Sequence, residues 1–385
     1  MVYNLKFSES SRVRAADYFM TRDLPVSHRD LLLSDKDREK AVTVINLIYI
    51  HDSNVGITRK RIGKKFIYVE NQKIIRDKRI IDRIKKLVIP PSWRNVWICK
   101  DPAGHIQATG YDLKNRKQYI YHEQWKTLRS ETKFHRLYEF GKSLPDIRRQ
   151  VQKDLLDKEL TESKVLATLI ALIDKTYIRI GNSEYEKMNG SYGLTTLKDK
   201  HVIINGKTIR FSFNGKKGIR HEITINNKRL AKTVKQCRDI PGKELFQYYD
   251  TQGNRKSVDS GMVNNYIRNA SGNDFSAKDF RTWAGSLYAL ERLCAIGKAG
   301  DESLVKKNIK NVLDEVSKRL GNTAGICKKY YVHPALLSLY EDGSLPKPMS
   351  KSTNSRAVNF NHAENLLLKI LRQCIRNGYS PNPGQ

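Results

Sequence analysis

The sequence predicts an α+β protein: an N-terminal antiparallel β-sheet domain with short helices, followed by a larger, mainly α-helical domain that contains a small three-stranded sheet. Three observations lead to this prediction. Apolar and polar residues alternate with period two in several segments between residues 64 and 122, as in strands that bury one face. From Trp125 onward the pattern changes to long helical segments. A second alternating stretch, residues 201 to 225, interrupts these helices.

The N-terminal part is expected to begin with a polar arm and a helix. In SDKDREKAVTVINLIYI, Ser34 is the expected N-cap, and Asp37 stands three residues later as an imperfect capping box. A short amphipathic helix is expected around RIIDRIKKLV and should stop before Pro90 and Pro91, because proline does not continue a helix.

Four strands are expected in the same part of the chain, and turn material such as PAG and LKNR separates the last three. They are KKFIYVE (64–70), VWICK (96–100), HIQATGYD (105–112) and KQYIYH (117–122). Short turns between alternating segments are typical of an antiparallel meander.

Long helices are expected in the larger domain. SKVLATLIALIDKTYIRIG and NIKNVLDEVSKRLG each finish in a glycine, the residue that most often closes a helix. Between them, the Asn205-Gly206 and Asn214-Gly215 pairs are strong hairpin signals, so residues 201–225 should form three strands. Beyond about residue 345 a loop precedes a last amphipathic helix, HAENLLLKILRQCI.

A chain of 385 residues is long enough for more than one domain. The pattern changes predict a first domain over residues 1–125, in which 1–50 form the arm and first helix, a second domain over 126–345, and a C-terminal tail over 346–385.

The charge points to a polyanionic partner. There are 71 Lys and Arg residues against 40 Asp and Glu, a formal net charge of +31 spread along the whole chain. Duplex DNA fits best, because basic side chains release its condensed counterions. An anionic membrane is the weaker alternative, since no apolar stretch approaches the roughly 20 residues that span a bilayer.

Other composition features favour an intracellular protein without cofactors. The start of the sequence lacks the basic-then-apolar order of a signal peptide. Five widely separated cysteines have no zinc spacing with histidine and fit a reducing compartment. The segment GKT at 206–208 is not a P-loop, because His201 stands where the first glycine is required. Asp112, Asp199 and Asp279 are isolated, so no two-metal site is expected.

Chemistry on a phosphodiester without metal or ATP needs a nucleophilic side chain, cations on the nonbridging oxygens and a general acid. Bidentate arginine suits the oxygens. Lysine can serve as the acid when neighbouring cations lower its pKa, and tyrosine becomes a competent nucleophile in strongly positive surroundings.

Four stretches supply such residues: YIRIGNSEYEKMNGSYGLTTLKDKHV (177–202), FNGKKGIRHE (213–222), AKDFRTWAG (277–285) and LGNTAGICKKYYVHP (320–334). In this order and at these separations they closely resemble the type IB DNA topoisomerases of the poxvirus and bacterial kind. Residues 89–125 are also similar to the DNA-clamp domain of that family, so the resemblance covers roughly residues 50–340.

The resemblance implies a role for each catalytic candidate. Arg179 and Arg281 would bind the scissile phosphate, and Lys216 would be the general acid, with Lys217 the adjacent alternative. Tyr331 would be the nucleophile, because it lies nine residues after Asn322. Asn322 stands where poxvirus enzymes have histidine, and its amide would donate a hydrogen bond to the phosphate and stabilise the transition state. Tyr330 is the alternative if the register slips.

The resemblance also implies DNA contacts. The candidates are Arg116, Lys117, Gln118, Tyr119, Tyr121, Tyr185 and Lys278. On an alternating strand Tyr119 and Tyr121 share a face, and the family places the corresponding segment in the major groove. Packing on a core is nearly as good an explanation for one of these two tyrosines.

The implied protein is a monomer that clamps duplex DNA and relaxes positive and negative supercoils through a 3′-phosphotyrosyl intermediate. It would work with DNA inside cells, in a cytoplasm or nucleoid, or in a virion and viral factory if viral. A tyrosine recombinase is the first alternative, although Lys278 stands where recombinases usually have histidine. An architectural DNA-binding protein with a decayed site is the second.

Overall fold

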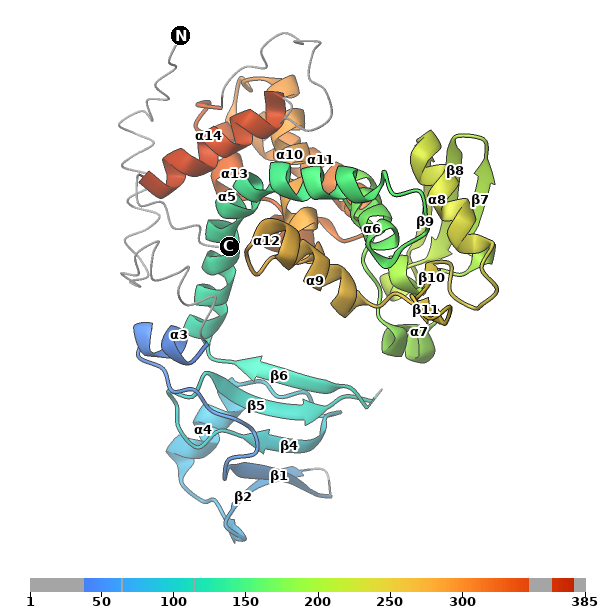
Figure 1. Cartoon of the computed structure of the whole chain (residues 1–385). Helices are drawn as coiled ribbons and strands as arrows, with labels where there is room; N and C mark the ends of the chain where they lie inside the picture. Colours follow the sequence, from blue (N-terminus) through green and yellow to red (C-terminus); the bar gives the residue numbers. More distant parts are fainter. Residues whose placement is uncertain (1–37, 64, 114, 346–361, 377–385) are drawn as a thin grey trace. The chain divides into compact units, whose positions relative to one another are not determined.

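The computed structural model describes residues 38–63, 65–113, 115–345 and 362–376. Within these ranges it describes every side chain except those of Ser130, Glu131, Thr132, His135, Glu184, Tyr185 and Met188. The described residues form two compact units, and along the chain the boundary between them falls after His135, inside helix α5 (Glu123–Asp154) (Figure 1). The predicted mixed α+β class is confirmed, and the predicted domain limits stay predictions.

The N-terminal unit is built on a six-stranded antiparallel sheet with the order β3-β2-β1-β4-β5-β6. The strands are β1 (Ile57–Ile62), β2 (Lys65–Glu70), β3 (Lys73–Ile74), β4 (Arg94–Ile98), β5 (Ile106–Tyr111) and β6 (Lys117–Tyr121). All four predicted strands are present. Strands β1 and β3 were not predicted, because ITRKRI is rich in charge and β3 has only two residues.

Helix α4 (Lys78–Lys86) packs on this sheet and confirms the short predicted helix. In the core between helix and sheet, Ile84 of α4 packs with Ile57, Val96, Ile98 and Ala108. The Asp77 side chain caps the helix by accepting a hydrogen bond from the Arg79 N–H at 2.8 Å.

The first predicted helix is shorter than expected. Helix α3 (Arg38–Val44) ends well before Ile50. Asn46 has a left-handed φ of 55°, and Ile48 forms an isolated bridge with Gly104, which requires extended backbone. The predicted cap at Ser34 lies outside the described residues.

The C-terminal unit is mainly helical. Its helices after α5 are α6 (Glu162–Thr176), α7 (Ser183–Asn189), α8 (Lys228–Arg238), α9 (Ser260–Ser271), α10 (Ala277–Ile296), α11 (Glu302–Leu320), α12 (Ala324–Tyr330), α13 (Pro334–Glu341) and α14 (His362–Arg376). Short 3-10 turns lie at η1 (Leu194–Thr196), η2 (Asp199–His201) and η3 (Lys216–Gly218), and β10 (Gln247–Tyr249) pairs with β11 (Arg255–Ser257). Helix α6 lies at the centre of the core, with Leu169 and Leu172 fully buried.

The predicted three-stranded sheet is confirmed. It has the order β7-β8-β9, formed by β7 (Val202–Asn205), β8 (Thr208–Asn214) and β9 (Arg220–Asn226). The first turn is a two-residue hairpin, as the Asn205-Gly206 signal predicts, with Gly206 and Lys207 between the paired residues Asn205 and Thr208. The second is longer, because η3 intervenes between Asn214 and Arg220, and Lys216 lies in this longer turn.

Helix ends were predicted with mixed success. Helix α11 ends at Gly321, which has a φ of 58°, as the sequence indicates. Helix α6 ends earlier than its glycine, at Thr176, because Tyr177 takes the left-handed C-cap conformation and donates its N–H to the Ile173 carbonyl. The predicted last helix is present as α14, whose Leu367 and Ile370 are buried in the unit's main core.

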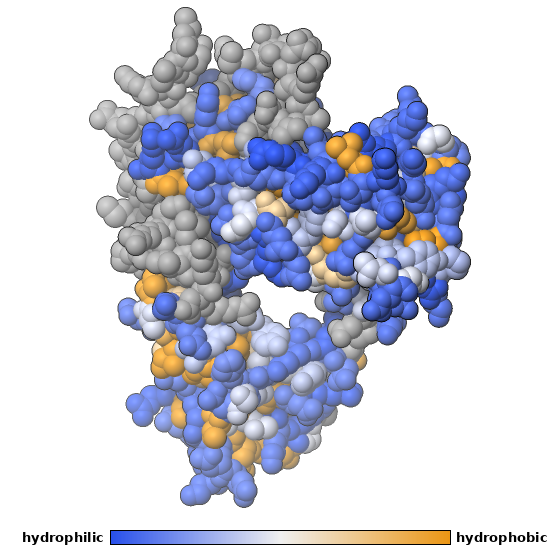
Figure 2. Space-filling view, in the orientation of Figure 1, coloured by the Kyte–Doolittle hydropathy of each residue, from blue (hydrophilic) through white to orange (hydrophobic). Residues whose placement is uncertain are grey.

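Hydrophilic residues dominate the visible surface of both units, with apolar residues in small scattered patches (Figure 2). Within the described ranges, no helix carries an apolar stretch long enough to cross a membrane. All five cysteines are buried as free thiols.

Candidate active site

Four of the five catalytic candidates lie together in the C-terminal unit. Arg179 follows α6, Arg281 lies on α10, Asn322 follows α11, and Tyr331 is the C-cap of α12. Hydrogen bonds or close ring contacts link Arg179 with Asn322 and Arg281 with Tyr331. Residues far apart in the sequence therefore form one cluster.

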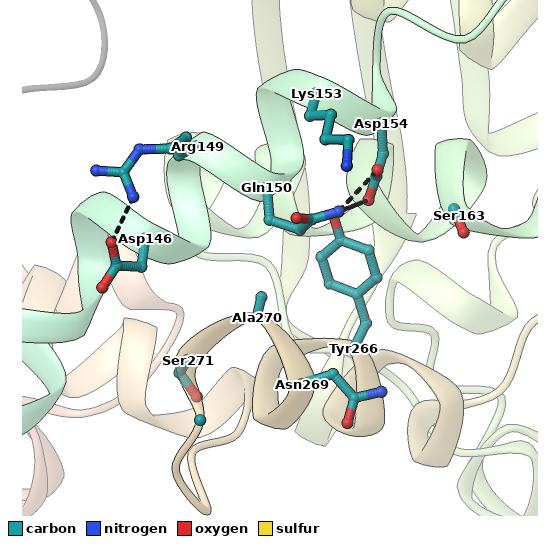
Figure 3. A pocket seen from close by; sticks show the side chains of 11 residues that line it. Asp146, Arg149, Gln150, Lys153, Asp154, Ser163, Tyr266, Asn269, Ala270 and Ser271 are labelled. Carbon is teal, nitrogen blue, oxygen red and sulfur yellow. Dashed lines mark hydrogen bonds and ion pairs between the residues drawn. The ribbon is translucent and has the colours of Figure 1, made fainter.

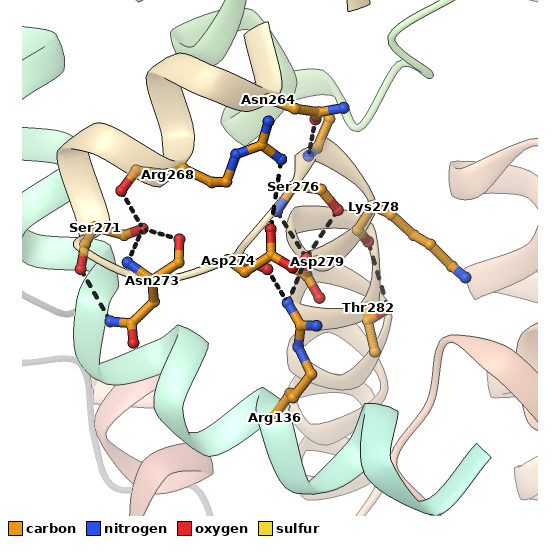
Figure 4. A network of polar contacts seen from close by, with 11 residues as sticks. Arg136, Asn264, Arg268, Ser271, Asn273, Asp274, Ser276, Lys278, Asp279 and Thr282 are labelled. Carbon is orange, nitrogen blue, oxygen red and sulfur yellow. Dashed lines mark hydrogen bonds and ion pairs between the residues drawn. The ribbon is translucent and has the colours of Figure 1, made fainter. Parts of the chain in front are cut away.

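The N-terminus of α10 is held by a polar network (Figure 4). The Ser276 backbone N–H and hydroxyl both donate to the Asp279 carboxylate at 2.9 Å, a capping box. Arg136 on α5 lies 3.7 Å from the same carboxylate and also donates to the Asp274 carbonyl. Lys278 is exposed and points away from this network, so it remains available to an anion beside α10.

Arg281 is buried and fixed by backbone carbonyls. Its side chain is 4% exposed, and its terminal nitrogens donate to Leu320 O at 2.7 Å and to Tyr177 O. Burial lowers the pKa of Arg281 from its ordinary value. Two loops thus hold a guanidinium in one orientation before any substrate binds.

Arg179 lies beside Arg281. It donates to Gly321 O at 3.0 Å and to Asn322 Oδ1 at 2.5 Å. Burial, and then repulsion from Arg281, lower the pKa of Arg179 to about 10. Two guanidinium groups held this close repel each other, and a bound anion would relieve that repulsion.

Two buried donor atoms point to the same conclusion. Arg281 Nε and Asn322 Nδ2 have no acceptor among the described residues. Buried polar groups are nearly always hydrogen-bonded, because an unsatisfied buried donor costs about 1–3 kcal/mol. Because Asn322 Oδ1 accepts from Arg179, its amide nitrogen is the group left to bind an anionic oxygen.

Tyr331 lies against Arg281, with the guanidinium carbon 5.2 Å from the ring centroid. Its backbone is held closely: Ser286 Oγ donates to its carbonyl at 3.2 Å, and a Cβ at Gly285 would lie only 2.5 Å from that oxygen. Burial raises the pKa of Tyr331, but the charges of Arg281, Arg179 and Lys278 outweigh burial and lower it below the ordinary tyrosine value.

Tyr330 has different surroundings. It is 37% exposed, and its ring lies 5.5 Å from Lys329 Nζ. His333, two residues after Tyr331, is buried and caps α13 by accepting the Ala335 N–H at 3.2 Å. The structure thus brings Tyr331 to the two arginines, and it gives His333 the loop role expected from the sequence.

Lys216 and Lys217 are both exposed in the β8–β9 turn. Lys217 has the left-handed backbone, with a φ of 64°, whereas Lys216 begins the turn directly after buried Gly215. Lys216 therefore lies in the β8–β9 turn, on a different segment of the chain from the four clustered residues.

His221 is a site neighbour that sequence reasoning missed. A Cβ at Gly321 would lie 2.5 Å from its Cε1, and a Cβ at Gly215 would lie 2.6 Å from its Cδ2. Burial, and then the charges of Arg179 and Arg281, lower the pKa of His221 to about 4. In the sequence, His221 belongs to the FNGKKGIRHE motif, but no local pattern predicts that it contacts both glycines.

The predicted DNA-contact segment lies on edge strand β6 of the N-terminal unit and the turn before it. The cations there are paired with carboxylates: Arg116 Nε donates to Asp112 at 2.8 Å, and Lys117 Nζ lies 2.6 Å from Asp52. Gln118 Nε2 also donates to Asp112, at 3.0 Å. These pairs hold the polar side chains in place on the strand and its turn.

Tyr119 and Tyr121 share a face, as predicted. Their rings stack with centroids 5.8 Å apart and planes 10° apart. Tyr119 is 43% exposed, whereas Tyr121 packs against the cluster that contains Trp125. Core packing therefore holds for Tyr121, and DNA contact by Tyr119 stays a prediction. For Tyr185, on α7, the side chain lies outside the described part, and its role stays a prediction.

A separate pocket of about 680 Å³ lies between α5 and α9 (Figure 3). Asp154 on its wall accepts hydrogen bonds from Tyr266 Oη at 2.6 Å and from Gln150. None of the predicted site residues lines it. In the described ranges, no group of three His, Cys, Asp or Glu side chains is placed to hold a metal ion.

Two family models match this chain. The family model for the catalytic core of eukaryotic DNA topoisomerase I matches residues 122–350. The model for the N-terminal domain of bacterial DNA topoisomerase IB matches residues 65–112. The first match alone spans more than half of the chain.

Individual relatives are viral and eukaryotic. DNA topoisomerase 1B of Acanthamoeba polyphaga mimivirus is 35% identical over 326 residues, covering 82% of this chain and 94% of that protein. DNA topoisomerase 1B of Vaccinia virus (strain Copenhagen) is 26% identical over 249 residues, 63% of this chain and 75% of that protein. DNA topoisomerase 1 of Schizosaccharomyces pombe is 28% identical over 188 residues, 47% of this chain and 22% of that protein. The chain therefore belongs to the type IB DNA topoisomerase family.

Proposed function

We propose that this protein relaxes positive and negative supercoils in duplex DNA by cutting and rejoining one strand through Tyr331, without ATP or metal. The observation that carries the proposal is the pair formed by half-buried Arg179 and buried Arg281 beside Tyr331, with donors on Arg281 and Asn322 left unsatisfied. An anion with several oxygens meets those needs, and a phosphodiester brings a reactive phosphorus to the tyrosine.

In the first step Tyr331 gives up its proton to solvent and its oxygen attacks the scissile phosphorus. The bond from phosphorus to the 5′ oxygen breaks, and Lys216 protonates that oxygen as it leaves. The DNA is then joined to Tyr331 through a 3′-phosphotyrosyl bond, about which the free strand turns. Religation is the reverse: the 5′ hydroxyl attacks, and Tyr331 leaves.

Stabilisation of negative charge on the phosphate explains why arginine and asparagine side chains surround Tyr331. Negative charge builds on the nonbridging oxygens as the phosphorus becomes five-coordinate, so fixed donors stabilise the transition state more than the ground state. Arg179, Arg281 and Asn322 would supply those donors. The lowered pKa of Tyr331 supports its role, because more of the attacking phenolate forms near neutral pH.

DNA contacts would come from both predicted regions. We assign this role to Arg116, Lys117, Gln118, Tyr119 and Tyr121 in the N-terminal part and to Tyr185 and Lys278 in the catalytic part. The net charge of +31 supports extensive contact with phosphates. We propose a monomer clamped around the duplex, with residues 1–125 as the clamp domain, 126–345 as the catalytic domain and 346–385 as a tail. It would act wherever the DNA is, in a cytoplasm or nucleoid, or in a viral factory and virion.

Tyrosine recombination is the second candidate function. We propose that the catalytic part has the architecture that tyrosine recombinases and type IB topoisomerases share, and both use 3′-phosphotyrosyl chemistry. Lys278, in place of the histidine usual in recombinases, favours relaxation. Stable multimers on paired DNA sites would favour recombination instead.

Plasmid relaxation tests the proposal. Positively and negatively supercoiled plasmids are incubated with the protein in excess EDTA and without ATP, and topoisomers are resolved on agarose gels. Both substrates should relax to completion. Strict dependence on Mg²⁺ or ATP, or relaxation of one sign only, would contradict the proposed mechanism.

A further inference from the structure

His221 fills a space between two glycines that lie far apart in the sequence. A Cβ at Gly215 would lie 2.6 Å from the Cδ2 and Nε2 atoms of the ring, and one at Gly321 would lie 2.5 Å from Cε1. Carbon atoms in contact normally stay beyond about 3.4 Å. The ring therefore touches both backbones, and a side chain at either glycine would displace it.

The two glycines directly precede two candidate site residues. Gly215 is followed by Lys216 in the β8–β9 turn, and Gly321 is followed by Asn322 after α11. Asn322 is in turn bound to Arg179 at 2.5 Å. The imidazole of His221 thus lies between the β8–β9 turn, which carries the proposed general acid, and the Gly321-Asn322 loop, whose Asn322 would donate a hydrogen bond to the phosphate.

The ring is held firmly enough to act as a spacer. Its other neighbour is Phe213, the cross-strand partner of His221, whose ring stacks on the imidazole with centroids 5.1 Å apart and planes 21° apart. Burial, Arg179 and Arg281 keep His221 neutral near pH 7, with a pKa of about 4. A neutral ring adds shape to the site without adding a third fixed charge.

We propose that His221 is a positioning residue that sets the distance between Lys216 and the scissile phosphate by spacing the β8–β9 turn from the Gly321-Asn322 loop. The inference rests on the proposed function, in which Lys216 is the general acid. Proton transfer requires heavy atoms within hydrogen-bond reach, so a turn that collapses into the space of a missing ring should impair this step above all others.

The test compares two leaving groups. Single-turnover cleavage is measured on duplexes with an ordinary 5′ oxygen and on duplexes with sulfur in its place at the scissile bond. With sulfur the P–S bond breaks and a thiolate departs; a thiol has a pKa near ~8.5, so the thiolate needs no general acid. His221→Ala should slow oxygen cleavage about 10- to 100-fold and should cleave the sulfur substrate at close to the wild-type rate.

Lys216→Ala separates the inference from the proposed function. If Lys216→Ala regains its rate on sulfur and His221→Ala does not, His221 does not position the acid and the inference fails alone. If Lys216→Ala also stays slow on sulfur, Lys216 is not the acid, and both the inference and that part of the proposed function are wrong. Recovery of both variants supports both.

His201→Gln is the matched control. His201 is also buried and also lies near Phe213, at 6.5 Å, but it contacts neither glycine: its Nδ1 accepts the Lys198 N–H at 3.0 Å. This variant should cleave both substrates at equal fractions of the wild-type rate. A sulfur rescue equal to that of His221→Ala would mean that any loosening of this sheet impairs the acid, which overturns the assignment to His221.

Gly215→Ala gives an independent result if His221→Ala does not fold. Gly215 has a φ of −90°, which alanine adopts freely, so the added methyl acts only by pressing on the ring. Cleavage of the oxygen substrate should slow, and cleavage of the sulfur substrate should not. In the double variant Gly215→Ala/His221→Ala, the oxygen-cleavage rate relative to wild type should exceed the product of the relative rates of the two single variants. Wild-type oxygen cleavage by Gly215→Ala would contradict the spacer role.

Discussion

At the residue scale, the site depends on partners that lie far away in the sequence. The guanidinium of Arg281 is held by carbonyls 104 and 39 residues distant, at Tyr177 and Leu320. The two carbonyls lie at the C-terminal ends of helices α6 and α11, so the points at which these helices end determine the orientation of the arginine. A lysine could not bind two carbonyls and still present a third donor in the same plane.

Sequence patterns could identify the candidate side chains but not this arrangement. The order and separation of the four motifs pointed to Arg179, Arg281, Asn322 and Tyr331, and the structure brings these four together. Which donors are left unsatisfied, and that His221 lies against the site, depend on tertiary packing that no local pattern encodes.

The pH dependence of cleavage should respond to Lys278. Covalent attachment should accelerate as pH rises toward the pKa of Tyr331 and level off above it. Lys278 is one of the cations that lower this pKa, so Lys278→Met should raise the pKa and move the rising limb to higher pH. We expect a displacement of about half a pH unit, because a solvent-exposed charge interacts with the phenolate by roughly 0.7 kcal/mol.

The measurement is the single-turnover attachment rate from pH 5 to pH 10, at one ionic strength. Lys329→Met is the control, because Lys329 Nζ lies 5.5 Å from the Tyr330 ring and Lys329 is not among the main charges that lower the pKa of Tyr331. An equal displacement of both profiles would show that total charge, and not the local position of Lys278, sets the Tyr331 pKa.

At the scale of elements, α14 supports the catalytic helix. Glu364 on α14 is buried and accepts hydrogen bonds from Arg148 on α5, at 2.8 and 3.1 Å, and from Trp283 Nε1 on α10, at 3.3 Å. Arg148 also pairs with Asp174 of α6 at 2.9 Å. This helix lies beyond residue 350, where the family match ends, yet it is part of the core.

Glu364→Gln should destabilise the protein. Neutralising the buried carboxylate leaves the half-buried Arg148 with one charged partner instead of two, which should lower the free energy of unfolding by about 2–4 kcal/mol. Urea unfolding followed by tryptophan fluorescence measures this directly. Glu302→Gln is the control, since Glu302 pairs with Lys306 at 2.8 Å on an exposed surface, where a loss below about 1 kcal/mol is expected. Equal losses of unfolding free energy in the two variants would show that the buried Glu364 network stabilises the protein no more than an exposed ion pair does.

Elements with strong periodic patterns were predictable, and others were not. The hairpin β7–β8 and helices α4, α11 and α14 follow from alternation, turn dipeptides and closing glycines. Strand β1 was missed because its charged side chains hide the period-two signal, and α6 ended early because Tyr177, not a glycine, adopts the left-handed conformation. Pairing with neighbouring strands and tertiary contacts override local preference in such places.

At the scale of the whole molecule, net charge governs encounter with DNA. A chain with a formal charge of +31 should bind duplex DNA with a steep salt dependence, because each neutralised phosphate adds about 0.9 to the log–log slope. Binding is measured by fluorescence anisotropy between 50 and 300 mM salt. Lys117→Ala should lower the slope by about 0.9 if Lys117 exchanges Asp52 for a phosphate on binding.

Lys306→Ala is the matched comparison for that slope, because Lys306 is an exposed lysine already paired with Glu302 and is not a predicted DNA contact. The slope of this variant should equal that of the wild type. An unchanged slope in Lys117→Ala would remove Lys117 from the DNA-binding surface.

The central claim is that Tyr331 is the nucleophile, and trapping the covalent intermediate tests it most directly. Wild type, Tyr331→Phe and Tyr330→Phe are incubated in EDTA with duplex DNA labelled upstream of the cut, and the products are denatured and resolved by size. Wild type and Tyr330→Phe should carry the labelled strand on protein, attached at the 3′ end and mapped to Tyr331 by peptide sequencing, whereas Tyr331→Phe should carry none. A covalent adduct on Tyr331→Phe, or its loss only in Tyr330→Phe, would contradict the assignment.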